Sequence, residues 1–243
     1  MGDGPLNVVV DARPGAFVGL DAGAPATLAR DHLRAGGLAV NLAAARTWEP
    51  RPDWQALRAA WPRVRHHVHS VRAVALEAAP ERSLLALLDG GATWQPGRQE
   101  TLLAARQAAQ ALVAGWAGDG QALIRAARHL AGLGTGLTPA GDDLLAGFML
   151  HAWLAHPRPA DLCHDVVSAA ALRTTTLAAA FLRAASRGEC SAPWHALLHA
   201  LVSDQSQAIA DATHRVLAHG YTSGADTLAG FLWQARDVIM SND

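Results

Sequence analysis

The spacing of hydrophobic residues along the chain changes character near residue 50. Before that point, short β-branched or alternating stretches are separated by Gly, Pro and Asp, which favours strands joined by turns. These stretches lie at residues 6–12, 15–22 and 37–48. A short helix is expected between them, at residues 25–35.

From Asp53 onward, apolar residues recur at three- and four-residue spacing, as on one face of an α-helix. The pattern predicts roughly eight to ten helices joined by short turns that Gly or Pro marks. Segments with this periodicity include residues 98–116, 121–132, 142–155, 161–188, 194–201, 206–220 and 225–236. We therefore predict an α+β protein, with a small β-rich part at residues 1–52 and a larger all-helical domain at residues 53–243.

One stretch, GLGTGLTPAGDD at residues 132–143, breaks this helical pattern with four glycines, a Thr-Pro pair and two adjacent aspartates. A related order occurs again at residues 212–232. Both copies lead from a helix with an Arg/His pair, through Gly-x-Thr, to Gly-x-Asp-x-Leu-Ala-Gly-Phe. The matching positions are Gly141 with Gly224, Asp143 with Asp226, and Gly147 with Gly230. The sequence thus contains an internal repeat of helix, glycine turn and helix.

Helix capping explains part of this repeat without any ligand. Thr138 is a good N-cap, and Pro139 suits the first helical position, where no amide hydrogen bond is lost. In the second copy, the cap is either Thr222 or Ser223. Negative charge in a first helical turn is favoured by the helix dipole, which accounts for Asp142, Asp143 and Asp226.

The glycines inside the repeat need a further reason. Gly147 and Gly230 lie within predicted helices, where each costs ~1 kcal/mol relative to alanine, although the chain uses alanine freely elsewhere. Glycine at these positions indicates a close backbone approach, either between the two helices or between the amides and a ligand. A crossing there would bring two helix N-termini together, with free amides, hydroxyls and aspartates around them. Packing and ligand binding both remain open.

The amino-acid composition limits the catalytic and binding groups that the chain can use. The chain contains no lysine, so its 20 Lys-plus-Arg residues are all arginines. This excludes Schiff-base chemistry and a phosphate-loop lysine, and it leaves arginine as the partner for carboxylates and phosphates. Arg173, followed by three threonines, could cradle such an anion; the alternative is a solvated helix face whose threonines bond back to the preceding turn.

Charge and targeting signals limit the partners that we expect. The net charge of −1 argues against binding to nucleic acid or to an anionic membrane. The first residues carry no pattern of a secretory signal, and no apolar stretch is long enough to span a bilayer, so we expect a cytoplasmic protein.

Histidine is abundant, with 12 copies, but its spacing predicts no metal site. His67 and His69 have strand-like spacing, and His195 and His199 lie one helical turn apart. Neither pair is accompanied by the glutamate or cysteine of a common zinc motif, so we expect no metal and no other cofactor.

Three segments together resemble a known bacterial family. GLGTGLTPAGDDLLAGF, RTTTLAAAFLRAASRGE and HGYTSGADTLAGF are similar, in order and spacing, to the family of the third subunit of oxamate carbamoyltransferase. The resemblance covers roughly residues 95–240. It implies carbamoyl transfer between oxalurate or oxamate and phosphate or carbamoyl phosphate in allantoin degradation. It also implies two different partner subunits, one of them similar to succinyl-CoA synthetase.

The roles of individual residues are our inference from their chemistry. We expect a small anionic substrate, a carboxylate or phosphate, to be bound by the amides of Gly134, Gly136 and Gly141 and by the side chains of Thr138, Thr174, Thr175, His219, Thr222 and Ser223. The expected catalytic residues, which hold carbamoyl N–H groups or orient the arginine, are Asp142, Asp143, Arg173 and Asp226.

Two other functions remain as alternatives. In the first, the chain is a non-catalytic scaffold or ligand-sensing subunit of a multi-subunit enzyme, and its glycines serve only the crossing of helices. In the second, which is the weakest, Ser223, His219 and Asp226 form the triad of a hydrolase, although the sequence lacks a nucleophile elbow.

Overall fold

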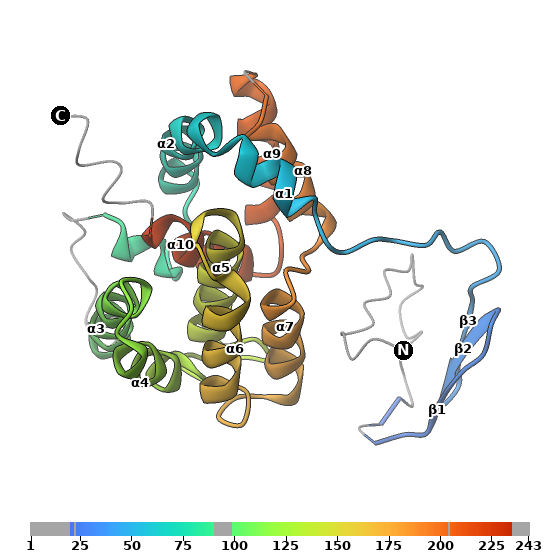
Figure 1. The fold of residues 1–243 in the computed structure, drawn as a ribbon. Helices are drawn as coiled ribbons and strands as arrows, with labels where there is room; N and C mark the ends of the chain where they lie inside the picture. The colour runs from blue at the N-terminus through green and yellow to red at the C-terminus, as the bar shows by residue number, and fades with distance from the viewer. Residues whose placement is uncertain (1–19, 22, 90–98, 204, 235–243) are drawn as a thin grey trace. The chain divides into compact units, whose positions relative to one another are not determined.

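The chain divides into two compact units, one of residues 6–49 and one that contains residues 50–243 (Figure 1). The computed structural model describes residues 20–21, 23–89, 99–203 and 205–234. The α+β class predicted from the sequence is confirmed, because a small antiparallel sheet is followed by a run of helices. The domain boundary between residues 52 and 53 stays a prediction.

The smaller unit contains a three-stranded antiparallel sheet in the order β1–β2–β3. Its strands are β1 (Ala26–Leu28), β2 (His32–Ala35) and β3 (Leu38–Asn41). Thr27 pairs with Arg34 and Leu33 with Val40. Strands β2 and β3 are joined by Gly36 and Gly37, and the φ of +53° at Gly36 suits the tight two-residue turn of a hairpin.

This hairpin makes the helix expected at residues 25–35 wrong. The Gly-Gly turn pairs its two flanks, and that pairing outweighs the weak helical spacing before it. The strand expected at residues 37–48 is confirmed only as β3. The strand expected at residues 6–12 lies outside the described residues, as does most of the one at 15–22.

The larger unit is helical throughout its described part (Figure 1). Its elements are α1 (Trp54–Ala59), α2 (Trp61–Glu77), the 3₁₀ helix η1 (Leu84–Leu87), α3 (Gln99–Trp116), α4 (Gly120–Leu130), α5 (Ala140–Ala155), α6 (Pro159–Ala170), α7 (Thr176–Ser186), α8 (Ala192–Ala200), α9 (Ser206–Leu217) and α10 (Ser223–Trp233). None of the helices described is both long and apolar enough to cross a membrane.

The single helix expected over residues 161–188 is two helices, α6 and α7, separated by a turn. Thr175 is the reason for the break. It adopts an extended backbone conformation and its Oγ1 accepts a hydrogen bond from the Ala178 amide at 3.0 Å, so it caps α7 instead of continuing α6. The turn frees residues 171–175 for contacts with other segments.

Helices α5 and α10 pack against each other at the centre of the larger unit, with η1 and α9 beside α10 and α6 and α7 beside α5 (Figure 1). A Cβ added at Gly147 would overlap the carbonyl oxygen of Thr227, and a Cβ added at Gly230 would overlap that of Leu144. The two contacts are reciprocal. Gly147 lies against the residue three positions before Gly230, and Gly230 lies against the residue three positions before Gly147. The close helix approach expected from the sequence is therefore present.

The repeat extends this symmetry to the helix that precedes each glycine turn. A Cβ at Gly141 would overlap the Leu130 carbonyl oxygen at the end of α4, and a Cβ at Gly224 would overlap the Val216 carbonyl oxygen in α9. Each glycine thus lets the first turn of α5 or α10 lie directly against the helix before it. The two copies of the repeat therefore use a glycine at the same position to make the same close helix contact.

An aromatic cluster surrounds His151, which lies in the core with only 2% of its surface exposed. Its ring centroid is 5.2 Å from that of Phe231, 5.4 Å from Trp116 and 5.8 Å from Trp61. Burial lowers the pKa of His151 to about 4, against the opposing effect of a hydrogen bond with the backbone at Phe231. The imidazole is therefore neutral near pH 7.

We predict that Gly147→Ala destabilises the protein by at least about 2 kcal/mol, because two helix backbones would have to separate to admit one methyl group. Urea denaturation measures the effect. Gly120→Ala is the matched control, since a Cβ there meets no atom within 4 Å. Equal midpoints for the two variants would contradict the close helix contact.

We also predict that acid destabilises the protein through His151. The unfolded chain takes up this proton near pH 6.5, whereas the folded chain does so only near pH 4, so the free energy of unfolding falls as the pH drops across that window. His151→Leu should flatten this dependence. Denaturation of both proteins from pH 7 to pH 4 tests the effect, and identical slopes would refute it.

Candidate functional site

The loop between α4 and α5 contains three glycines in the left-handed region of backbone conformation. Gly132, Gly134 and Gly136 have φ values of +74°, +116° and +101°. In the described structure, the five amides of residues 134–138 donate to no acceptor of the chain. Residues 134–137 are also exposed to solvent. Successive free amides around glycines of positive φ, next to a helix N-terminus, are typical of carboxylate and phosphate sites.

The two copies of the repeat are joined by a pair of hydroxyl groups. Thr138 Oγ1 lies 3.0 Å from Ser223 Oγ, and either atom can donate. The capping role expected for Thr138 is wrong, because Pro139 occupies the N-cap position of α5 and no side chain bonds there. Thr222 does hold the N-cap position of α10, but its side chain makes no capping hydrogen bond.

The turn between α6 and α7 lies against the glycine loop. Thr174 Oγ1 donates to Asp142 Oδ2 at 2.6 Å, and Thr175 Oγ1 donates to the Leu137 carbonyl oxygen at 2.5 Å. A Cβ at Gly132 would lie 2.9 Å from the Arg173 carbonyl oxygen. The threonine run therefore holds the backbone at Arg173 beside the loop, which leaves the side chain of Arg173 exposed.

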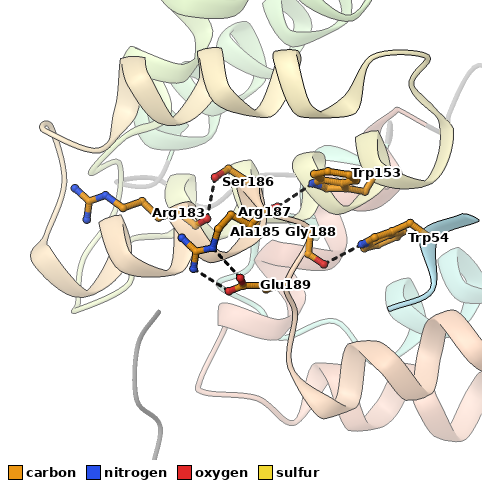
Figure 2. Close-up of polar contacts among 8 residues, drawn as sticks. All are labelled: Trp54, Trp153, Arg183, Ala185, Ser186, Arg187, Gly188 and Glu189. Carbon is orange, nitrogen blue, oxygen red and sulfur yellow. Dashed lines mark hydrogen bonds and ion pairs between the residues drawn. The ribbon is translucent and has the colours of Figure 1, made fainter. Parts of the chain in front are cut away.

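The opposite end of α7 is fixed by two indole groups (Figure 2). Trp153 Nε1 donates to the Ala185 carbonyl oxygen at 3.2 Å, and Trp54 Nε1 donates to the Gly188 carbonyl oxygen at 2.9 Å. With both ends of α7 anchored, the turn that carries Arg173 has a defined place next to the loop. No hydrogen bond or ion pair engages the Arg173 guanidinium in the described part of the chain.

Asp142 is a structural link between the loop and the turn. Only 3% of its surface is exposed, and its Oδ2 accepts hydrogen bonds from the Gly132 amide at 3.0 Å and from Thr174. Burial raises the pKa of Asp142, while these two hydrogen bonds lower it. Its other oxygen, Oδ1, is buried and accepts no hydrogen bond within the described residues.

Asp143 holds its proton much more tightly than an ordinary aspartic acid. Burial raises the pKa of Asp143 to about 8, against the Ser223 hydroxyl, which lowers it. The charges of Asp226 and Asp142 raise it further, and the Thr138 hydroxyl lowers it. Asp143 therefore carries its proton near pH 7, so it does not repel an anion at the loop.

Asp226, the counterpart of Asp143 in the second copy, has a different environment. It is fully buried, with 0% of its surface exposed, and its Oδ1 accepts a hydrogen bond from the Leu84 amide at 2.6 Å. This bond ties the start of η1 to α10. Asp226 thus holds the backbone at the start of η1 from a site without solvent contact, and the catalytic role expected for it stays a prediction.

Two further expectations need correction. The Gly141 amide donates to the Leu133 carbonyl oxygen at 2.9 Å, so it is not available to bind an anion. The triad of Ser223, His219 and Asp226 is not assembled, because Ser223 Oγ pairs with Thr138 and Asp226 bonds Leu84. His219 itself is exposed, in the loop that precedes α10.

One histidine of each pair lies within hydrogen-bonding distance of a backbone carbonyl oxygen. His67 and His69 lie on helix α2 and not on a strand, and His67 Nδ1 is 2.9 Å from the Leu201 carbonyl oxygen. His195 Nε2 is 3.0 Å from the Pro50 carbonyl oxygen. Within the described ranges, no group of three or more His, Cys, Asp or Glu side chains is placed to hold a metal ion.

The site brings together most, but not all, of the residues that the sequence singled out. Thr138, Ser223, Asp143, Thr174 and Thr175 join the loop, the turn and the second copy of the repeat. Thr135 and Leu137, whose amides belong to the free series, are not among the residues predicted from the sequence. The alternation of glycine with other residues at 132–136 was the signal that could have indicated them.

Comparison with known proteins supports the family suggested by the three motifs. Residues 130–235 match the family model described as oxamate carbamoyltransferase subunit AllH. The match begins at the last residue of α4 and includes the glycine loop, the turn with Arg173 and both helices of the central crossing. No solved structure matches the chain.

We predict that Asp143→Asn stabilises the protein at pH 8 by about 1 kcal/mol or more. The unfolded chain loses this proton near pH 3.8 and the folded chain only near pH 8, so the free energy of unfolding of the wild type falls as the pH rises across that window. Asparagine mimics the neutral acid and removes this dependence.

Denaturation from pH 4 to pH 8 measures the difference. The control is Asp165→Asn, on the exposed side of α6, which should keep the pH dependence of the wild type. If Asp143→Asn and the wild type lose the same free energy across the window, the buried, protonated state assigned to Asp143 is wrong.

Proposed function

We propose that this chain, which belongs to the oxamate carbamoyltransferase AllH family over residues 130–235, binds the anionic substrate of that enzyme at its glycine loop. The observation that carries the proposal is the series of five free amides at residues 134–138, directly before the 16-residue helix α5 and beside the exposed Arg173. The proposed ligands are oxamate, oxalurate, phosphate and carbamoyl phosphate.

Each group of the proposed site has a distinct task. The amides of Gly134, Thr135 and Gly136 would hold one anionic end of the ligand, as nests of backbone N–H groups do. The guanidinium of Arg173 would bind a planar carboxylate or a phosphate with two parallel hydrogen bonds. Thr174 and Thr175 would act indirectly, because their hydroxyls already hold the turn in place.

The reaction itself requires positioning more than a covalent nucleophile. In the direction of degradation, a phosphate oxygen attacks the carbamoyl carbon of oxalurate, the C–N bond to oxamate breaks, and the departing nitrogen takes up a proton. Positive charge and oriented N–H groups stabilise the negative charge that develops on the carbamoyl oxygen. The loop and Arg173 are suited to this role.

Asp143 is the carboxyl group that we propose for proton transfer. Its pKa of about 8 lies close to neutral pH, the range in which general acids and bases are most effective. The Thr138–Ser223 hydroxyl pair links the two copies of the repeat beside it. Asp142 and Asp226 are less suited, because both are buried and hold backbone amides.

A second candidate function is a scaffold or ligand-sensing subunit whose catalytic groups lie in other subunits. The observation in its favour is that two of the three aspartates make structural hydrogen bonds, which leaves one titrating group at the site. Binding of the anion would be retained in this case, while Asp143→Asn would leave the rate of carbamoyl transfer unchanged.

We predict that Arg173→Ala and Gly136→Ala each weaken binding of oxamate to the isolated chain by at least about tenfold. Calorimetry with oxamate, and then with phosphate, measures the affinity. Arg183→Ala is the control for the arginine, because it is exposed at the far end of α7. Gly118→Ala controls for backbone strain, because its φ of +113° resembles that of Gly136 and neither added Cβ meets an atom within 4 Å.

Unchanged affinity in both site variants would refute the proposed site. With the remaining subunits present, phosphate-dependent cleavage of oxalurate then separates the two functions. Loss of this activity in Asp143→Asn, with oxamate affinity retained, supports proton transfer within this chain, whereas full activity supports the scaffold.

A further inference from the structure

Exposed apolar side chains gather around the glycine loop. In the described part of the helical unit, five large hydrophobic residues are exposed, and four of these lie on the loop, on the neighbouring turn and its helix, or on the loop before α10. They are Leu137, Leu172, Leu177 and Tyr221, with 73%, 93%, 38% and 79% of their surfaces exposed. The fifth is Leu103 on α3. We call these four residues the apolar rim.

Hydrogen bonds join the segments that carry the apolar rim. Leu137 accepts a hydrogen bond at its carbonyl oxygen from Thr175, which lies between Leu172 and Leu177. Thr138, the residue after Leu137, pairs with Ser223, two residues after Tyr221. The rim residues are therefore neighbours in space although they come from three parts of the sequence. A concentration of exposed apolar groups on otherwise polar loops is typical of a protein–protein contact.

The segments that carry the apolar rim hold one formal charge at pH 7, the positive charge of Arg173. Across residues 131–138, 171–177 and 218–223, the ionisable side chains are Arg173, His219 and Tyr221, and no acidic residue occurs. Asp142 and Asp143 lie just outside these segments; the first is buried, and the second is partly buried and protonated near pH 7. A surface that fits the rim would therefore be apolar at its centre and would carry carboxylates opposite Arg173.

We propose that a different subunit of the carbamoyltransferase, through an apolar surface bordered by carboxylates, docks on the apolar rim and closes over the glycine loop. The identity of this partner and of the anion beneath it rests on the proposed function. Residues 134–137 of the loop are exposed to solvent in the chain alone. Closure by a second protein would exclude water from the transferred carbamoyl group, which strengthens every electrostatic interaction at the site.

A second copy of this chain fits the rim less well. In a symmetric dimer, the same surface is used by both copies, so two Arg173 guanidinium groups would enter one interface and no acidic group of these segments would offset them. Repulsion between like charges at an interface disfavours such a pairing. The charge pattern therefore favours a partner of different sequence.

The test compares charge variants of the rim in the full chain, mixed with the remaining purified subunits of the carbamoyltransferase. Leu172→Glu combined with Tyr221→Glu should weaken association by at least about tenfold, because acids are placed opposite the acids of the partner. Leu172→Arg combined with Tyr221→Arg should weaken it less. Leu103→Glu, at the exposed leucine outside the rim, should leave the affinity unchanged. Analytical ultracentrifugation gives the affinity and the stoichiometry.

Equal losses in the Glu and Arg variants would overturn the acidic character of the partner surface, and no loss in either would overturn the docking site. The proposed docking of a different subunit would also be overturned if the wild-type chain associated with itself in preference to the other subunits and the same variants abolished this self-association. Oxamate binding to the wild-type chain is measured separately. If that binding is absent while the rim variants still block association, the proposed function fails and the docking surface stands.

Discussion

The contact between α5 and α10 is the constraint on which the rest of the helical unit depends. Gly147 lies against the Thr227 carbonyl and Gly230 against the Leu144 carbonyl, so the two backbones touch with no side chain between them. This approach brings the first turns of both helices together, where Thr138 and Ser223 share a hydrogen bond. A larger residue at either glycine would move the two helix starts apart.

The crossing of α5 and α10 also positions the loops that precede these two helices. The glycine loop at residues 132–138 is fixed at its start by Asp142, which accepts hydrogen bonds from the Gly132 amide and Thr174. In the described structure, the amides of residues 134–138 make no hydrogen bond. The partly buried carboxyl of Asp143 carries its proton near pH 7, so it adds no negative charge at the start of α5. The repeated segment therefore makes the central helix contact and also carries the groups of the proposed anion site, so helix packing and the proposed ligand binding are compatible.

The sequence predicted the helical unit and its central crossing well, because periodic apolar spacing and helical glycines report directly on packing. It failed where a hydrogen bond formed with a residue distant in sequence. Asp226 bonds Leu84, and Thr138 pairs with Ser223 instead of capping its own helix, and no local pattern carries either contact. The break before α7 could have been recognised, since Thr175 is a strong capping residue in a run of threonines. The hairpin at residues 26–41 differs from the helix predicted there because its Gly-Gly turn pairs the two flanking segments, which outweighs their weak helical spacing.

The central claim, that the free amides of the glycine loop hold an anion, is tested most directly by nuclear magnetic resonance of the ¹⁵N-labelled chain during titration with oxamate. The account predicts that the amide signals of Gly134, Thr135 and Gly136 shift progressively and saturate together. The signals of Gly118 and Gly120, at a glycine-marked turn in another part of the helical unit, should stay in place. Saturable shifts confined to another part of the chain, or no shifts at all, would contradict it.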